Sequence, residues 1–119
     1  MKALGDRYES IAAEWLRQRG LTIIARNFRT RWGEIDIIGL DEGCLVFVEV
    51  RARGNPAFSS AAASVTHHKQ RRIIAAAQRY LQSRPHMQQS ACRFDVIAFG
   101  APEPGRQAPI RWIRSAFTN

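Results

Sequence analysis

Residues 33–52 read GEIDIIGLDEGCLVFVEVRA, and this stretch decides the fold. Residues 33–40 and 44–52 are rich in aliphatic and β-branched side chains, which predicts two strands. The segment Asp41–Gly43 between them is a hairpin turn signal, so the two strands are expected to pair antiparallel. The second strand is apolar on both faces in its inner part, which predicts a central place in a sheet.

The flanking sequence predicts the other elements. Upstream, an amphipathic helix begins near Leu4 and ends before Gly20, and a strand follows over residues 21–28. Downstream, we expect a helix over 66–83, a strand over 93–100 and a short terminal strand over 110–117. The predicted order is α-β-β-β-α-β-β: a single mixed α/β sheet with a helix on each face. A right-handed crossover through the second helix makes the third and fourth strands parallel.

Size and composition limit the class of protein. The chain has 119 residues, which indicates one domain over 1–119, and its 45% hydrophobic and 24% charged residues exclude wholesale disorder. No apolar run approaches the ~18 residues that span a bilayer, and the first residues lack a signal-peptide core. The two cysteines suit neither a disulfide scaffold nor a zinc site. We expect a cytoplasmic protein with reduced cysteines and no membrane partner.

The positive charge is concentrated in the second part of the chain. Residues 1–50 hold 7 basic and 8 acidic residues, a net charge of −1, whereas residues 51–119 hold 11 basic and 2 acidic residues, a net charge of +9. Between residues 51 and 91 there are 7 basic residues and no acidic one. A field of one sign on a small domain favours a polyanionic partner, so we expect nucleic acid.

Two carboxylates lie inside the otherwise apolar strands of the hairpin. Antiparallel pairing places Asp36 opposite Val48 or Glu49, so Asp36 and Glu49 can be neighbours on one face. Converging carboxylates repel each other unless a cation lies between them, and hard oxygen ligands without Cys or His suit Mg²⁺ or Mn²⁺. The alternative is an ion network without metal, in which Arg51 and Arg31 neutralise the two acids.

Three motifs together resemble a known family. They are Gly-Glu-Ile-Asp at 33–36, Phe-Val-Glu-Val-Arg at 47–51 and Arg-Phe-Asp-Val at 93–96, after an opening helix with Gly5 and Glu9. As an ordered set, from about Gly5 to Phe99, they resemble the bacterial YraN family. That family is similar to the Holliday-junction-resolvase branch of the restriction-endonuclease-like fold. The resemblance implies an Asp…Glu-x-Lys nuclease core, in which Asp36 and Glu49 hold the metal and Glu9 completes the site.

Arg51 departs from that pattern, which expects lysine. Burial can lower the pKa of a lysine enough for it to act as a base, whereas arginine stays charged. Arg51 can still stabilise charge on a phosphate, so we count it with Asp36 and Glu49 as a catalytic candidate. Lys69, at the start of the second helix, is an alternative source of the missing ammonium group.

A basic cluster crowds the N-terminus of the second helix. Its residues are His67, His68, Lys69, Arg71 and Arg72. Cations oppose the helix dipole at this end, so helix stability does not explain them, whereas a bound phosphate does; a solvated basic turn is the alternative. The predicted nucleic-acid contacts are Arg51, Arg53, Lys69, Arg71 and Arg72.

Three further residues or segments have predictions of their own. The Ser- and Ala-rich loop from Arg53 to Ser64 is expected to be mobile and to border the site. Trp32 either stacks on a base or covers a sheet edge. Asp95 is expected to be structural and to lie at the end of its strand away from Glu49.

The prediction for function is a DNA-binding protein with a nuclease-like carboxylate site for Mg²⁺ or Mn²⁺. Cleavage of branched or flapped DNA by a structure-specific endonuclease is one reading. The alternatives are a binding module of the same fold without catalysis and an adaptor whose basic face meets an acidic protein. Because junction-cutting relatives of this fold act as dimers, the resemblance also motivates a homodimer.

Overall fold

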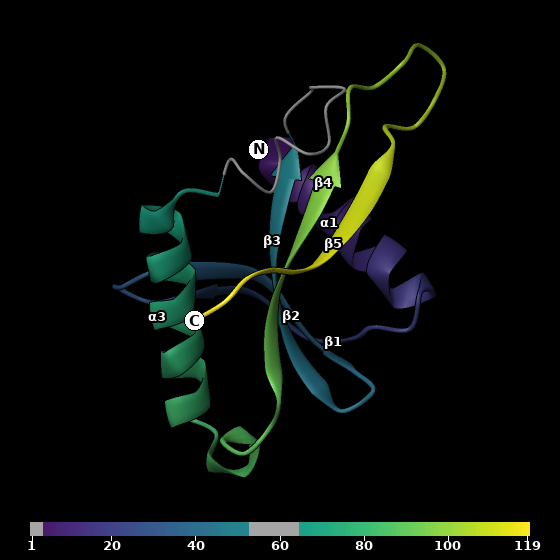
Figure 1. Cartoon of the computed structure of the whole chain (residues 1–119). Helices are drawn as coiled ribbons and strands as arrows, with labels where there is room; N and C mark the ends of the chain where they lie inside the picture. Colours follow the sequence, from purple (N-terminus) through teal and green to yellow (C-terminus); the bar gives the residue numbers. More distant parts are fainter. Residues whose placement is uncertain (1–3, 53–64) are drawn as a thin grey trace.

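The computed structural model describes residues 4–52 and 65–119, with the backbone alone for residues 4–6. Figure 1 shows the described α-helices on opposite sides of one sheet. The helices are α1 (Leu4–Gln18) and α3 (His67–Gln82), with a 3-10 turn η1 (Pro85–Met87). The strands are β1 (Thr22–Arg29), β2 (Glu34–Asp41), β3 (Cys44–Ala52), β4 (Cys92–Phe99) and β5 (Ile110–Phe117).

The five described strands lie in the order β1-β2-β3-β4-β5, and the sheet is mixed. β3 and β4 are parallel, and the other neighbouring pairs are antiparallel. The β2–β3 turn has positive φ at both central residues, 50° at Glu42 and 83° at Gly43. Two such residues match the right-handed twist of the strands that they join. The predicted hairpin, the parallel pair and the order of elements are confirmed.

Each face of the sheet packs against one of the described helices. Leu45 and Phe47 of β3 belong to the core under α3, and Val46 and Val48 belong to the core under α1. This alternation is what a strand dictates, because successive side chains point to opposite faces. β3 is therefore buried on both faces in the middle of the sheet, as its apolar sequence predicts.

Regular pairing between β2 and β3 ends close to the acidic residues. The last paired residues are Ile37 and Val48. Beyond them, an Asp36 carboxylate oxygen accepts a hydrogen bond of 2.8 Å from the backbone N–H of Val50. A side-chain oxygen here takes the place of a backbone carbonyl of β2. Ile35 and Ile38 share one core although they are three residues apart, which breaks the simple alternation of β2. This local break brings the Asp36 carboxylate to the backbone of β3.

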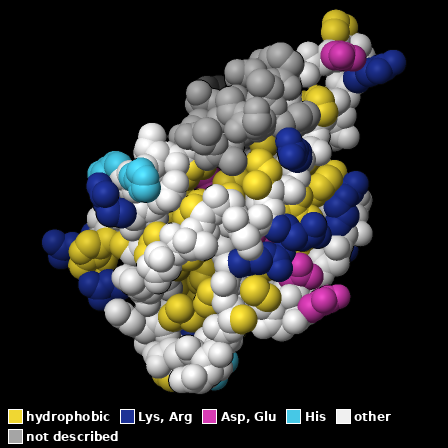
Figure 2. Space-filling view, in the orientation of Figure 1, with side chains coloured by type: hydrophobic (Ala, Val, Ile, Leu, Met, Phe, Trp, Pro, Cys, Tyr) yellow, Lys and Arg dark blue, Asp and Glu magenta, His cyan; other side chains and the backbone are white. Residues whose placement is uncertain are grey.

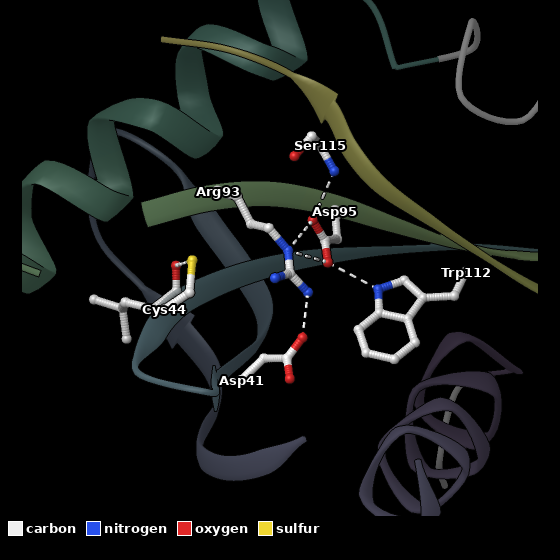
Figure 3. A network of polar contacts seen from close by, with 7 residues as sticks. Asp41, Cys44, Arg93, Asp95, Trp112 and Ser115 are labelled. Carbon is white, nitrogen blue, oxygen red and sulfur yellow. Dashed lines mark hydrogen bonds and ion pairs between the residues drawn. The ribbon is translucent and has the colours of Figure 1, made fainter. Parts of the chain in front are cut away.

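A buried polar network around Asp95 connects β4 to other strands of the sheet (Figure 3). Asp95 is fully buried and accepts hydrogen bonds from Arg93 Nε at 3.1 Å, Trp112 Nε1 at 2.8 Å and the Ser115 backbone N–H at 2.9 Å. Arg93 also pairs with Asp41 at 2.8 Å. These contacts join β5 and the β2–β3 turn to β4, which agrees with a structural role for Asp95.

The expected place of Asp95 along its strand is wrong. Asp95 pairs with Val48, and Val96 pairs with Glu49, so the two acids are almost level rather than at opposite ends. They are kept apart because neighbouring register positions point to opposite faces. The face of the sheet, and not the strand end, separates Asp95 from Glu49.

Candidate functional site

Glu49 is a buried acid in the central strand. Its residue is only 4% exposed, and it follows Leu45 and Phe47 on the face covered by α3. Burial, together with the nearby Asp36 carboxyl group, raises the pKa of Glu49 to about 8, although Lys69 acts in the opposite direction. The site therefore holds a carboxyl group whose negative charge the fold disfavours.

Asp36 and Glu49 meet, as the hairpin register predicts. The Asp36 carboxyl group is near enough to Glu49 to raise its pKa, although the two residues are on different strands. Asp36 is held in this position by the Val50 backbone N–H. Two carboxyl groups in contact form a set of hard oxygen donors with an excess of negative charge.

Lys69 reaches this acid pair from α3. Its Nζ lies 3.2 Å from Glu49 Oε2, and its side chain remains 38% exposed. The first turn of α3 is fixed because Thr66 Oγ1 accepts a hydrogen bond from the Lys69 backbone N–H at 3.1 Å. Lys69 is thus both close to the acids and open to solvent on one side.

Gly33 allows α3 to approach the hairpin that carries Asp36. A Cβ atom at this position would lie 2.0 Å from the carbonyl oxygen of Arg72, closer than any real contact. Only glycine lets the backbone of the β1–β2 turn touch the first turns of α3. This close approach gives a physical reason for the glycine of the Gly-Glu-Ile-Asp motif, three residues before Asp36.

Arg51 is a second cation beside the same oxygen of Glu49. Its guanidinium nitrogen is 3.7 Å from Glu49 Oε2, and the side chain is mostly buried. Glu49 therefore has two cationic neighbours, Arg51 from β3 and Lys69 from α3. In the ion-network alternative, Arg51 takes its expected place, whereas the Arg31 guanidinium lies 5.1 Å from the ring centroid of Trp32.

Glu9 is buried on α1 and pairs with Arg26 of β1 at 3.6 Å. Across residues 4–52 and 65–119, no group of three or more His, Cys, Asp and Glu side chains converges on one point. The described site consists of two carboxylates, Asp36 and Glu49. The prediction that Glu9 supplies a third carboxylate ligand for a metal ion stays a prediction.

The basic residues of the predicted cluster lie in the first turns of α3. Figure 2 shows histidine and Lys or Arg side chains on the end of α3 that begins with His67. Arg71 and Arg72 are exposed, as a surface for phosphates requires. Arg53 and the loop prediction for residues 53–64 lie outside the described residues. None of the described helices is long and apolar enough to cross a membrane.

The sequence predicted Lys69 as a nucleic-acid contact, and only as an alternative to Arg51 at the acid site. The signal for it was present, because Lys69 follows an N-cap threonine by three residues at the start of a strongly basic helix. Sequence reasoning also missed Arg79, whose guanidinium lies 3.5 Å from the ring centroid of Trp32. That contact joins α3 to the β1–β2 turn, and local spacing cannot reveal it.

Chemically, this arrangement combines hard anionic oxygens with two kinds of cation. The carboxylates suit a divalent ion, and the guanidinium suits two oxygens of one phosphate. The lysine ammonium group is a compact proton donor with three N–H bonds. Such a set of groups is able to bind a phosphodiester and to neutralise its negative charge.

Comparison with other proteins identifies the family. The sequence profile of uncharacterised protein family UPF0102 matches residues 8–99. A UPF0102 protein of Alcanivorax borkumensis is 47% identical over 118 residues, which cover 98% of this chain and 92% of the relative. A second, of Saccharophagus degradans, is 46% identical over 114 residues, with 96% and 92% covered.

A third relative, from Ralstonia nicotianae, is 49% identical over 119 residues, which cover 97% of this chain and 86% of that protein. The span matched by the family profile contains Asp36, Glu49 and Lys69, together with the motifs that resemble the YraN family. The chain therefore belongs to the family UPF0102.

Proposed function

We infer that this protein is a DNA-binding, metal-dependent endonuclease that acts on branched or flapped DNA. The observation that carries the proposal is the contact of Lys69 Nζ with Glu49 at 3.2 Å, in a cluster that also holds Asp36. It supplies the ammonium group that Arg51 cannot supply. The mixed α/β sheet and the motif order support the resemblance to the restriction-endonuclease-like fold.

The residues present fit a divalent metal ion. Asp36 and Glu49 would hold Mg²⁺ or Mn²⁺, because their oxygens are hard donors and their mutual contact is unfavourable while both are charged. When bound, such an ion supplies an activated water and neutralises phosphate charge. The residues of the chain have to bind the phosphodiester, orient it and handle the protons.

Lys69 and Arg51 divide these tasks. The Arg51 guanidinium can contact two oxygens of one phosphate, which orients the phosphate and offsets its charge. Lys69 presents an ammonium group at the edge of the acid pair, where it can hold or deliver a proton at a phosphate oxygen. Its partial exposure leaves room for a strand of DNA to reach it.

The basic face of α3 supports a nucleic-acid partner. Arg71 and Arg72 are exposed within the helical turn that follows Lys69, and residues 51–119 carry a net charge of +9. DNA affinity gained from such contacts is largely independent of sequence and depends on salt. A cytoplasmic location suits this role and the two free cysteines, Cys44 and Cys92. A homodimer would suit a branched substrate with two equivalent arms.

One observation favours a second candidate function, a DNA-binding module without catalysis. Glu49 already has two cationic neighbours, Lys69 at 3.2 Å and Arg51 at 3.7 Å, which is the ion network expected without metal. In that case the site would be a structural remnant, and the basic face alone would act. Metal binding and cleavage separate the two functions.

The test is a single-turnover cleavage assay with Mg²⁺ or Mn²⁺ on duplex, flap and junction DNA. We expect metal-dependent cutting by the wild type, its loss in Asp36→Asn and Lys69→Met, and its retention in the control Glu34→Gln. Glu34 lies on the same strand but is exposed and pairs with Arg29 at 3.4 Å.

DNA binding without cutting in every variant would establish the binding module instead. No DNA binding at all would leave the protein-interaction adaptor. Arg51→Lys adds a further distinction: reduced cutting indicates that the bidentate guanidinium is used, and increased cutting indicates that the wild type is a weakened nuclease.

A further inference from the structure

Trp32 is an exposed aromatic residue in the turn between β1 and β2. It is 42% exposed, and among the described residues it is the large hydrophobic side chain that the core leaves out. Exposing an indole forgoes the free energy of burying it, so a position that holds one on the surface invites a functional explanation. The indole contacts the guanidinium group of Arg79 on α3.

The turn that presents Trp32 is held firmly. Thr30 Oγ1 accepts hydrogen bonds from the backbone N–H groups of Trp32 at 3.1 Å and Gly33 at 3.0 Å. The Thr30 backbone N–H donates to the Gly33 carbonyl at 2.8 Å. Gly33 itself packs against the backbone of Arg72. The indole is therefore pre-positioned, which lowers the entropy lost when it binds a partner.

The surroundings of the indole are cationic. The Arg79 guanidinium lies 3.5 Å from its ring centroid, and Arg31 lies 5.1 Å from it. Figure 2 shows hydrophobic side-chain surface flanked by Lys and Arg side chains at the left edge, where Figure 1 places α3 and the β1–β2 turn. A shallow hollow beside Trp32 is lined by Ala75, Gln78, Arg79 and Gln82. An aromatic face between guanidinium groups complements a nucleobase and its phosphates.

This patch is connected to the acid pair along α3. A basic stripe on one side of α3 consists of Lys69, Arg72 and Arg79, because their spacing brings them to the same side of the helix. Lys69 lies at Glu49, and Arg79 lies at Trp32. Ten residues of helix span ~15 Å. At ~3.4 Å per nucleotide along one DNA strand, that distance is about four nucleotides.

We propose that Trp32 and Arg79 form a stacking platform for an unpaired base on the single-stranded arm of a branched DNA. The bound strand runs along the basic stripe of α3, about four nucleotides from the phosphate at Glu49 and Lys69. The inference rests on the proposed function, because it adds a single-stranded arm to the DNA substrate proposed there. The platform explains why the indole is exposed, why its turn is fixed and why arginine covers it.

The test measures binding and tryptophan fluorescence with two DNAs, a blunt duplex and the same duplex with a single-stranded arm of about four nucleotides. Reactions contain EDTA, so cleavage plays no part. We expect the armed DNA to bind the wild type more tightly and to quench its fluorescence. Trp32→Ala should weaken binding of the armed DNA about 5- to 150-fold, the range for loss of one stacked base, and leave blunt-duplex binding nearly unchanged.

Two variants make the result specific. Trp32→Phe keeps an aromatic ring and should retain part of the preference for the arm. Trp15→Phe is the matched control, because Trp15 also lies under an arginine, Arg19 at 3.7 Å, but on α1. It should leave both affinity and quenching by the armed DNA in place.

The outcomes separate this inference from the proposed function. If the wild type binds both DNAs equally, or if Trp32→Ala keeps full preference for the arm, the platform is refuted while DNA binding stands. If the wild type binds neither DNA, the proposed function fails and the platform fails with it. An RNA arm of the same sequence, bound in preference to DNA, would overturn the assignment of the arm as DNA.

Discussion

Replacing Glu49 by Gln is the sharpest test of the acid pair. The substitution keeps the size of the side chain and its ability to form hydrogen bonds but removes the charge. In the metal-free protein the pKa of Glu49 is raised from 4.5 to about 8 by burial and by Asp36. The folded state therefore binds more protons than the unfolded state between these two values. Wild-type stability should fall as pH rises through this window.

The magnitude follows from the size of the shift. Each pKa unit corresponds to 1.36 kcal/mol, so the ionisable side chain costs the folded state on the order of 3 kcal/mol at pH 7 and under ~1 kcal/mol at pH 5. Glu49→Gln should remove this cost. We expect the metal-free variant to be more stable than the wild type at pH 7, with a difference that shrinks toward pH 5.

The assay is urea unfolding in EDTA at several pH values, with Glu34→Gln as the control for a lost acidic charge. Glu34 is exposed, so its substitution should change the free energy of unfolding by less than ~0.5 kcal/mol. If Glu49→Gln instead loses ~3–5 kcal/mol at pH 7, Glu49 is an ionised partner of Lys69 and Arg51. The reasoning from burial and Asp36 would then be refuted.

Four further predictions follow from the same contacts. Saturating Mg²⁺ or Mn²⁺ at about 100 times its Kd should stabilise the wild type by ~2.7 kcal/mol and leave Glu49→Gln unchanged, and an equal effect on both would contradict the metal site. The double variant Arg71→Ala/Arg72→Ala should reduce the log–log salt slope of duplex binding by ~1.8, whereas an unchanged slope would exclude both arginines as phosphate contacts. Gly33→Ala should cost ~1–3 kcal/mol in urea unfolding, because its Cβ collides with the Arg72 carbonyl, and wild-type stability would contradict that close approach. Asp95→Ala should cost ~3–5 kcal/mol because it leaves buried donors without their acceptor, and a loss below ~1 kcal/mol would show that the network contributes little.

The acid pair was predictable because its determinants are local. A short turn of known type joins β2 to β3, so counting outward from Asp41 and Cys44 brings Asp36 near Glu49. The apolar pattern of residues 44–52 likewise determined that β3 is central, since a strand that is apolar on both faces has to be covered on both. Element order, the parallel pair and the family resemblance also follow from the residues alone.

The position of Lys69 depends on tertiary packing. Lys69 is twenty residues from Glu49 along the chain, and only the docking of α3 on the sheet brings its Nζ to 3.2 Å. The same docking, made possible by Gly33, places Arg79 over Trp32. Periodicity predicts which face of a helix is apolar, but it does not predict which strand residue that face meets.

The break in β2 shows the same division. Alternation predicts side-chain directions in a regular strand, and it holds for β3, where Leu45 and Phe47 share a core. It fails near Asp36, where regular pairing of β2 with β3 ends. There the Asp36 carboxylate, and not a backbone carbonyl of β2, accepts the hydrogen bond from the Val50 N–H. The sequence by itself determined the elements, their order and the acid pair, because turns and periodicity act over a few residues. The tertiary structure decided which cations face the pair and which aromatic residue stays exposed, because those contacts depend on how a helix packs against a sheet.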